Sequence, residues 1–276
     1  MILTRTRGPK DWRKGLADPV KHWRPGYSAM SLAYCWEQAK GFPVSVQQAL
    51  ATHPALSGIE LLLATPEYKV LLPGGRAASQ NDLFVLARSR EGLVTIMVEG
   101  KVAEPFGPLV AEWLVDASPG KIERLAFLCQ TLALSTDQVG GVRYQLLHRT
   151  ASALIEARRF HATSAVLLVH SFSKSKEWFG DFRTFAGLYR IDPEPGRIYS
   201  AGKLEGAELF LGWVSDPGDY GEAPGAITTV TGTAAARKCE CCGHHEIGIE
   251  TSDGKFIPVR PGDKVQITGD DIDATD

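Results

Sequence analysis

Two apolar runs joined by a short polar turn stand out in the sequence, Asp82-Leu-Phe-Val-Leu-Ala-Arg-Ser-Arg-Glu-Gly-Leu-Val-Thr-Ile-Met-Val-Glu-Gly-Lys101. Two such runs, with Glu91 and Gly92 between them, are typical of a β-hairpin. Side chains alternate across a strand, so we expect Glu99 and Lys101 to share one face. An acid and a base at the end of an apolar strand are costly to bury without partners. The hairpin is therefore the first place to look for function.

Three charged residues are expected at one end of this hairpin. Asp82 opens the first strand, and a turn near residue 91 brings it to the same end as Glu99 and Lys101. Converging carboxylates can bind Mg²⁺ or Mn²⁺, which take oxygen ligands, and the carbonyl of Gly100 is a further candidate ligand. A partly desolvated lysine can activate water or stabilise a phosphorane. The alternative is that Glu99 and Lys101 form a structural ion pair at the strand end.

The rest of the chain predicts helices and strands around the hairpin. Helical spacing of apolar residues is found in residues 28–40, 46–50, 120–134, 144–160 and 178–189. Further β-like runs occupy residues 68–72, 165–169 and 208–214. This order predicts an α/β or α+β fold with a mixed central sheet flanked by helices.

Asp82 followed by Glu99-Gly100-Lys101 on the next strand resembles the metal-binding signature of the PD-(D/E)XK (restriction-endonuclease-like) nucleases. The stretches Ser79-Gln-Asn-Asp82 and 98–107 look like an uncharacterised bacterial branch of that superfamily. The resemblance covers about residues 20 to 215 and implies a core of helix, three-stranded meander, helix and strand. It departs from the strict pattern at Asn81, which stands where the signature has proline, and in the inserted helix at 120–134.

The resemblance implies a function and further site residues. It implies a metal-dependent nuclease that binds nucleic acid, with DNA favoured over RNA. The alternative is a catalytically inactive protein of the same fold that binds nucleic acid or another protein. Family members often contribute a glutamate from the first helix, which Glu37 matches, and a polar residue from the second core helix. Gln145 and Arg149, one helical turn apart, are the matching candidates there.

Composition and charge restrict the partners. The formal net charge is −2, so any nucleic-acid binding requires a local basic patch. The basic and aromatic residues between Arg5 and Arg24 are either a solvated arm or a flank that contacts phosphates. No apolar run approaches the roughly 18 residues that span a bilayer, and the N-terminus lacks the apolar stretch of a secretory signal. We expect no membrane partner and a cytoplasmic location.

Several residues outside the hairpin are expected to be structural. Cys35 and Cys129 lie alone in apolar, helix-like segments and are expected to be buried. Glu104 and Glu112 are expected at the surface or as helix caps. His170 is expected to cap a strand rather than bind a metal.

The C-terminal part is expected to be a separate module. We predict a nuclease-like domain with a basic arm over 1–216, a linker over 217–236, a small β module over 237–268 and an acidic tail over 269–276. Asp253-Gly254 is a hairpin signal. The module is a candidate surface for a homodimer or a protein partner.

The module also contains a candidate zinc site. Cys239 and Cys242 have zinc-knuckle spacing, and His244 or His245 could add a ligand to a structural Zn²⁺. The alternative is an exposed reduced turn.

Overall fold

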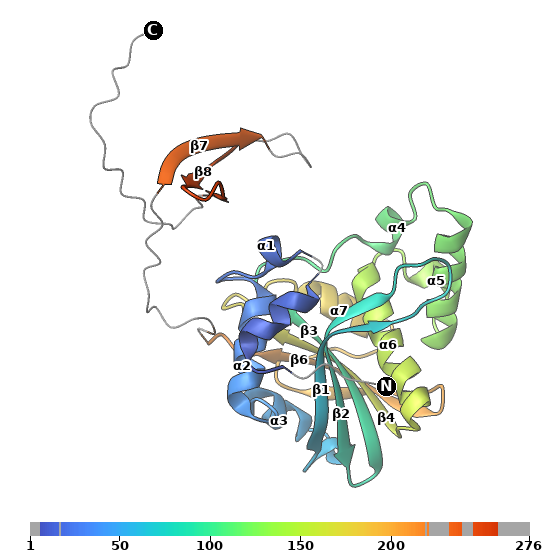
Figure 1. Cartoon of the computed structure of the whole chain (residues 1–276). Helices are drawn as coiled ribbons and strands as arrows, with labels where there is room; N and C mark the ends of the chain where they lie inside the picture. The colour runs from blue at the N-terminus through green and yellow to red at the C-terminus, as the bar shows by residue number, and fades with distance from the viewer. Residues whose placement is uncertain (1–5, 17, 219, 221–231, 239–244, 259–276) are drawn as a thin grey trace. The chain divides into compact units, whose positions relative to one another are not determined.

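The computed structural model describes residues 6–16, 18–218, 220, 232–238 and 245–258 (Figure 1). The chain divides into two units, Met1–Gly221 and Glu222–Asp276. The first contains a six-stranded mixed sheet, and the second a three-stranded antiparallel sheet. These sheets confirm the predicted α/β class with a small C-terminal β appendage.

The strand order of the large sheet is β1-β2-β3-β4-β6-β5. It begins with an antiparallel meander, continues with two parallel pairs and ends with β5, which pairs antiparallel with β6. Its strands are β1 (Glu60–Val70), β2 (Ser79–Ser89), β3 (Gly92–Lys101), β4 (Ser164–Ser171), β5 (Ile198–Leu204) and β6 (Ala207–Ser215). The hairpin predicted from Asp82 to Lys101 is β2 and β3, and β4 pairs in parallel with both β3 and β6. Two features escaped prediction: β1 extends back to Glu60, and β5 forms an edge strand.

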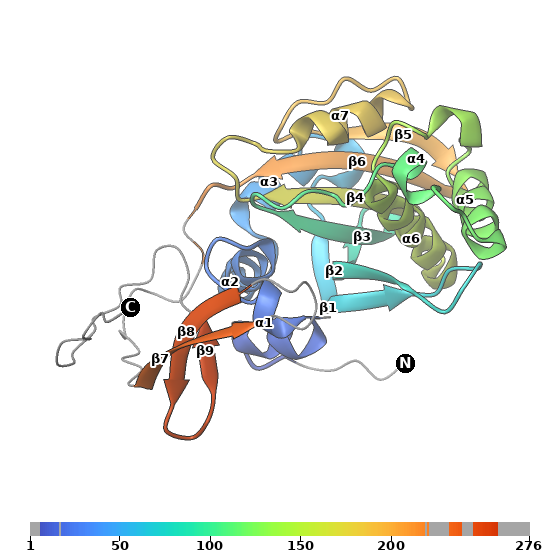
Figure 2. The same ribbon diagram turned by 90° about the horizontal axis from the view of Figure 1, so that it is seen from above.

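Helices cover both faces of this sheet (Figure 2). One core lies under α2 (Ser28–Ala39) and α3 (Val44–Leu50). The other lies under α5 (Pro119–Thr131), α6 (Tyr144–Phe160) and α7 (Phe179–Gly187). Shorter helical segments are Pro9–Gly15, α1 (Pro19–His22), Pro54–Leu56, α4 (Val110–Trp113) and Thr136–Gln138.

Successive side chains of β3 point to opposite faces of the sheet and therefore pack into different cores. Val98 contributes to the core under α2, whereas Met97 contributes to the core under α6. Glu99 and Lys101 follow Met97 in the alternation and so point toward α6. The predicted shared face of these two charged residues is therefore the α6 face.

The second unit is described by three strands, β7 (Gly232–Lys238), β8 (His245–Thr251) and β9 (Phe256–Pro258). The turn between β8 and β9 has Gly254 at φ 78°, as the Asp253-Gly254 signal predicts. β7 begins inside the stretch predicted as a linker, because its small residues gave no strand signal. Cys239, Cys242, His244 and the tail 269–276 lie outside the described residues, as does the side chain of His245.

Within the described residues, no helix combines the length and the apolar character that crossing a membrane requires.

Candidate active site

The site forms where the pairing of β2 with β3 ends. The last residues in register are Leu83 and Val98. Beyond them the amide of Gly100 donates to Oδ2 of Asp82 at 2.9 Å, so a side-chain carboxylate takes the place of the next backbone acceptor. In an extended strand the N–H and C=O of one residue point to the same side, so the Gly100 carbonyl also faces β2.

Gly100 packs closely against the first turn of α2. A Cβ atom at this position would lie 3.2 Å from Cβ of Ser28 and 3.5 Å from Oδ2 of Asp82. The first turn of α2 therefore rests directly against the site. Ser28 is the first residue of this helix, and Tyr27 is its N-cap.

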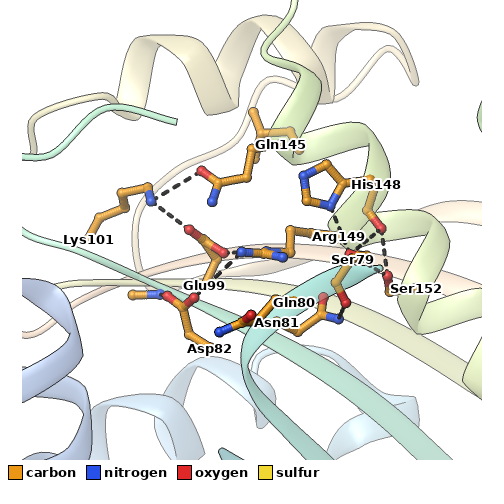
Figure 3. A network of polar contacts seen from close by, with 12 residues as sticks. Ser79, Gln80, Asn81, Asp82, Glu99, Lys101, Gln145, His148, Arg149 and Ser152 are labelled. Carbon is orange, nitrogen blue, oxygen red and sulfur yellow. Dashed lines mark hydrogen bonds and ion pairs between the residues drawn. The ribbon is translucent and has the colours of Figure 1, made fainter. Parts of the chain in front are cut away.

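A buried network joins β3 to α6 (Figure 3). The Lys101 ammonium donates to Oε1 of Glu99 at 2.6 Å and to Oε1 of Gln145 at 3.3 Å. The Arg149 guanidinium donates through Nε to Oε2 of Glu99 at 2.6 Å and places Nη2 3.6 Å from Oδ1 of Asp82. The structure thus brings five of the predicted residues together. The ion pair of the structural alternative is also present.

The two main carboxyl groups have opposite electrostatic surroundings. Burial, followed by the charge of Glu99, raises the pKa of Asp82 to about 8. Burial also opposes ionisation of Glu99, but Arg149 and Lys101 outweigh it and hold the pKa of Glu99 below its usual value. Negative charge is therefore balanced at Glu99 and in surplus at Asp82.

These groups form the floor of a cavity of about 720 Å³. Glu99 and Lys101 are 1% and 3% exposed, whereas Asp82 is half-buried and faces the open space. Two acids not predicted for the site, Glu67 and Glu104, also line the cavity.

Glu67 belongs to the acidic wall of the cavity. It lies on β1 with a left-handed backbone, φ 52°, and accepts from Nε2 of Gln80 at 2.6 Å. Burial raises its pKa to about 6. No local pattern marks Glu67 in the sequence, because its position depends on the pairing of β1 with β2.

Glu104 is a capping residue, as predicted. Its Oε1 accepts from the amide of Ser28 at 2.7 Å, and its Oε2 accepts from the amides of Val102 and Ala103. Glu112 also has its predicted role, since it accepts from the amide of Leu109 at 2.7 Å before α4.

Glu37 is not brought to the cavity, contrary to the expectation from the resemblance. Its Oε1 accepts from the Trp12 indole at 2.8 Å and from the Thr6 hydroxyl at 2.7 Å. It lines a separate cavity of about 190 Å³. A buried indole N–H needs an acceptor, and Glu37 supplies it for the N-terminal segment.

The donor set at the cavity floor fits a hard divalent cation. Asp82 and Glu99 offer carboxylate oxygens, which Mg²⁺ and Mn²⁺ prefer. Both oxygens of Glu99 already accept one hydrogen bond, and each keeps a second lone pair. The raised pKa of Asp82 reflects surplus negative charge that a cation would balance.

A second polar cluster lies on the opposite face of the sheet, around Asp216. Ligand atoms of Cys35, His170 and Asp216 lie within 4.8 Å of one another. The Trp36 indole donates to Nδ1 of His170 at 3.2 Å, so neutral His170 carries its proton on Nε2, toward Asp216. Metal binding through Nε2 would move that proton to Nδ1, where the Trp36 N–H already points.

The hydrogen bonds that the Asp216 carboxylate accepts come from neutral donors. Its carboxylate accepts from the hydroxyls of Ser45 at 2.7 Å and Tyr220 at 2.8 Å. The proximity of His170, whose Nε2 lies 3.6 Å from Oδ2, is the largest cause that lowers the pKa of Asp216. Burial raises the pKa of Cys35 to about 12, so its thiol stays protonated. Cys35 and Cys129 are both buried, as predicted. His170 is fully buried and does not cap a strand. We call this cluster of Cys35, His170 and Asp216 the hub.

The family described as "Domain of unknown function (DUF6946)" matches residues 5–218. The chain belongs to this family. The DUF6946 region contains every residue that lines the 720 Å³ cavity and ends before β7. A search of the curated proteins found no match, and neither did a search of the solved structures.

Proposed function

We propose that this DUF6946 protein is a metal-dependent nuclease of the PD-(D/E)XK type that hydrolyses phosphodiester bonds, with DNA as the favoured substrate. The observation that carries the proposal is the meeting of Asp82, Glu99 and Lys101 at the floor of a cavity, where β2 and β3 stop pairing. The succession α2, β1-β2-β3 meander, α6 and β4 is also the one the resemblance implies.

Each side chain has a role that follows from its contacts. Asp82 and Glu99 hold Mg²⁺ or Mn²⁺, which when bound supplies positive charge beside the phosphate and the attacking water. Lys101 positions that water and stabilises negative charge on the phosphorane. The Phe106 ring, 4.7 Å from its ammonium, keeps water from one side of Lys101.

Two residues of α6 position these groups. Arg149 fixes the orientation of Glu99 through its short Nε bond and lies beside Asp82. Gln145 accepts from Lys101 and so directs the ammonium. Both act through other side chains and are positioning residues.

Surplus acid charge favours a working site over a purely structural ion pair. The Glu99–Lys101 pair has no need of Asp82, whose carboxyl is costly to ionise beside Glu99. Charge of this kind at the floor of a cavity is typical of functional sites. The alternative is a catalytically inactive binding protein of the same fold. In that protein Asp82, Glu99 and Lys101 would have the same arrangement but would bind no cation.

The test is cleavage of labelled single-stranded DNA, duplex DNA and RNA with Mg²⁺, Mn²⁺ or chelator. We expect metal-dependent products with the wild type and none with Asp82→Ala. A folded wild type that cuts no substrate would contradict the proposal and favour the binding alternative.

Other expectations remain predictions. They are a cytoplasmic location, a homodimer or protein partner held through the C-terminal β module, and a structural Zn²⁺ at Cys239, Cys242 and His244 or His245.

A further inference from the structure

The chain that precedes α2 forms a wall of the active-site cavity. Leu16, His22, Gly26 and Tyr27 line the cavity from this segment, which we call the arm (residues 6–16 and 18–27). The arm is anchored at Trp12, which is 6% exposed and whose indole donates to Glu37.

The arm passes directly against an acid of the cavity. The carbonyl of Gly15 accepts from Nε2 of Gln80 at 3.2 Å. A Cβ atom at Gly15 would lie 2.8 Å from Cβ of Glu67, so only glycine fits there without displacement. The arm is thus packed into the site and is not a solvated extension.

The loop 103–105 continues this wall. Glu104 accepts from the amide of Ser28, which joins the loop to the end of the arm. The Trp178 indole donates to the carbonyl of Ala103 at 2.8 Å and so also anchors the loop. The arm and the loop together enclose one side of the cavity.

This enclosure restricts what can reach the acids. His22, Gly26, Ala103 and Pro105 are exposed, whereas Glu99 at the floor is buried. A phosphate must therefore pass an exposed rim to reach the floor. The cavity, about 720 Å³, has the size of a small-ligand pocket, about 300–1,000 Å³. An unpaired nucleotide can be splayed into such a space, whereas a base-paired one must first leave its stack.

We propose, on the basis of the proposed nuclease function, that the substrate enters this cavity as an unpaired strand and that one base stacks on Tyr27. Tyr27 is half-buried and lines the cavity. The Arg24 guanidinium lies 4.3 Å from the centre of that ring and donates to its hydroxyl at 2.9 Å. An aromatic ring held beside a cation is the usual platform for single-stranded nucleic acid.

Binding tests this proposal separately from cleavage. The full-length Asp82→Asn protein, which lacks the Asp82 charge and is expected not to cleave DNA, is titrated in chelator with fluorescein-labelled DNA. One probe is an unpaired strand of about 12 nucleotides, within the site sizes of single-strand binding folds. The other is the same strand annealed to its complement. Fluorescence anisotropy gives Kd for each.

We expect the unpaired strand to bind at least about tenfold more tightly than the duplex. Adding Tyr27→Ala to the Asp82→Asn protein should weaken that binding about tenfold, and Tyr27→Phe should preserve it. Tyr34→Ala is the matched control, because Tyr34 lies on α2 beside Trp23 and does not line the cavity.

Three results would overturn the inference: equal or tighter binding of the duplex, no effect of Tyr27→Ala, or no binding of either probe. Failure of the nuclease proposal has a different signature, since single-strand preference without any metal-dependent cleavage by the wild type refutes catalysis alone.

Discussion

Two buried acid clusters lie on opposite faces of the same sheet and differ in how their charge is balanced. At the cavity floor, burial and the neighbouring Glu99 raise the pKa of Asp82. In the hub, the proximity of His170, at 3.6 Å, is the largest of the effects that lower the pKa of Asp216. The first cluster lines a cavity of about 720 Å³. In the second, Asp216 accepts from two hydroxyls, and aromatic rings pack beside His170.

The difference separates a site from a structural feature. The carboxylate of Asp216 already accepts hydrogen bonds from neutral donors. It therefore stabilises the fold and needs no ligand to balance its charge. A carboxyl group that is costly to ionise, as Asp82 is, reduces the stability of the free protein and is typical of a site that awaits a charged partner.

The largest expected effect is on catalysis at the cavity floor. We predict that Lys101→Met lowers the single-turnover cleavage rate by about 10²- to 10⁴-fold, because the positioned ammonium is lost. Lys121→Met is the matched control, since Lys121 donates to a carbonyl on α4. An unchanged rate, or a variant unfolded by circular dichroism, would show that Lys101 is only half of a structural ion pair.

In the hub, the effect should be on stability alone. We predict that Asp216→Asn lowers the free energy of unfolding by about 2–3 kcal/mol, because hydrogen bonds to a charged acceptor are lost. The cleavage rate per folded molecule should not change. Urea denaturation checks the first statement. If folded Asp216→Asn cleaves more slowly than the wild type, the hub takes part in the reaction, and the two clusters do not differ in the way described here.

Divalent metal should distinguish the two clusters directly. We predict that Mg²⁺ stabilises the wild type by about 1.4 kcal/mol at ten times its Kd, because it binds only the folded site. Asp82→Asn should lose this stabilisation and Asp216→Asn should keep it. Thermal unfolding in Mg²⁺ and in chelator measures both, and equal shifts for the two variants would argue against a cation at Asp82.

The smallest expected effect concerns Glu37, which anchors the arm. We predict that Glu37→Gln destabilises the protein by about 1 kcal/mol and raises KM, because the bonds from Trp12 and Thr6 weaken. The value of kcat should stay unchanged. A large loss of kcat with an unchanged KM would return Glu37 to the catalytic role that the resemblance implies.

Local sequence patterns were enough to predict the centre of the fold. The alternation and turn between Asp82 and Lys101 predicted β2 and β3, and the helical period predicted α6 with its bounds. β5 was missed because its sequence, Ile-Tyr-Ser-Ala-Gly-Lys-Leu, is an exposed and partly polar edge strand. Such a strand depends on its pairing with β6 more than on its own residues.

The site was predictable where its residues share one element or one hairpin. That Glu67 and the arm line the cavity could not be predicted, because their positions depend on contacts between distant segments. The direction of Glu37 likewise depends on the packing of Trp12, which no spacing in the sequence reveals.

The most direct test of the contrast is the pH dependence of stability for Asp82→Asn and Asp216→Asn. The pKa of Asp82 is raised on folding, so its ionisation costs stability as pH rises from about 4 to about 8. The pKa of Asp216 is lowered, so its contribution is present above about pH 4 and lost only in acid.

Urea denaturation of both variants and the wild type from pH 5 to pH 9, without metal, measures this. Asp82→Asn should become more stable than the wild type as pH rises, by roughly 1–2 kcal/mol at the alkaline end, since partial exposure of Asp82 reduces the effect. Asp216→Asn should be less stable by a constant amount. If Asp82→Asn is less stable than the wild type, or if the difference in stability between the two does not change with pH, the Asp82 carboxyl does not carry the surplus charge described here.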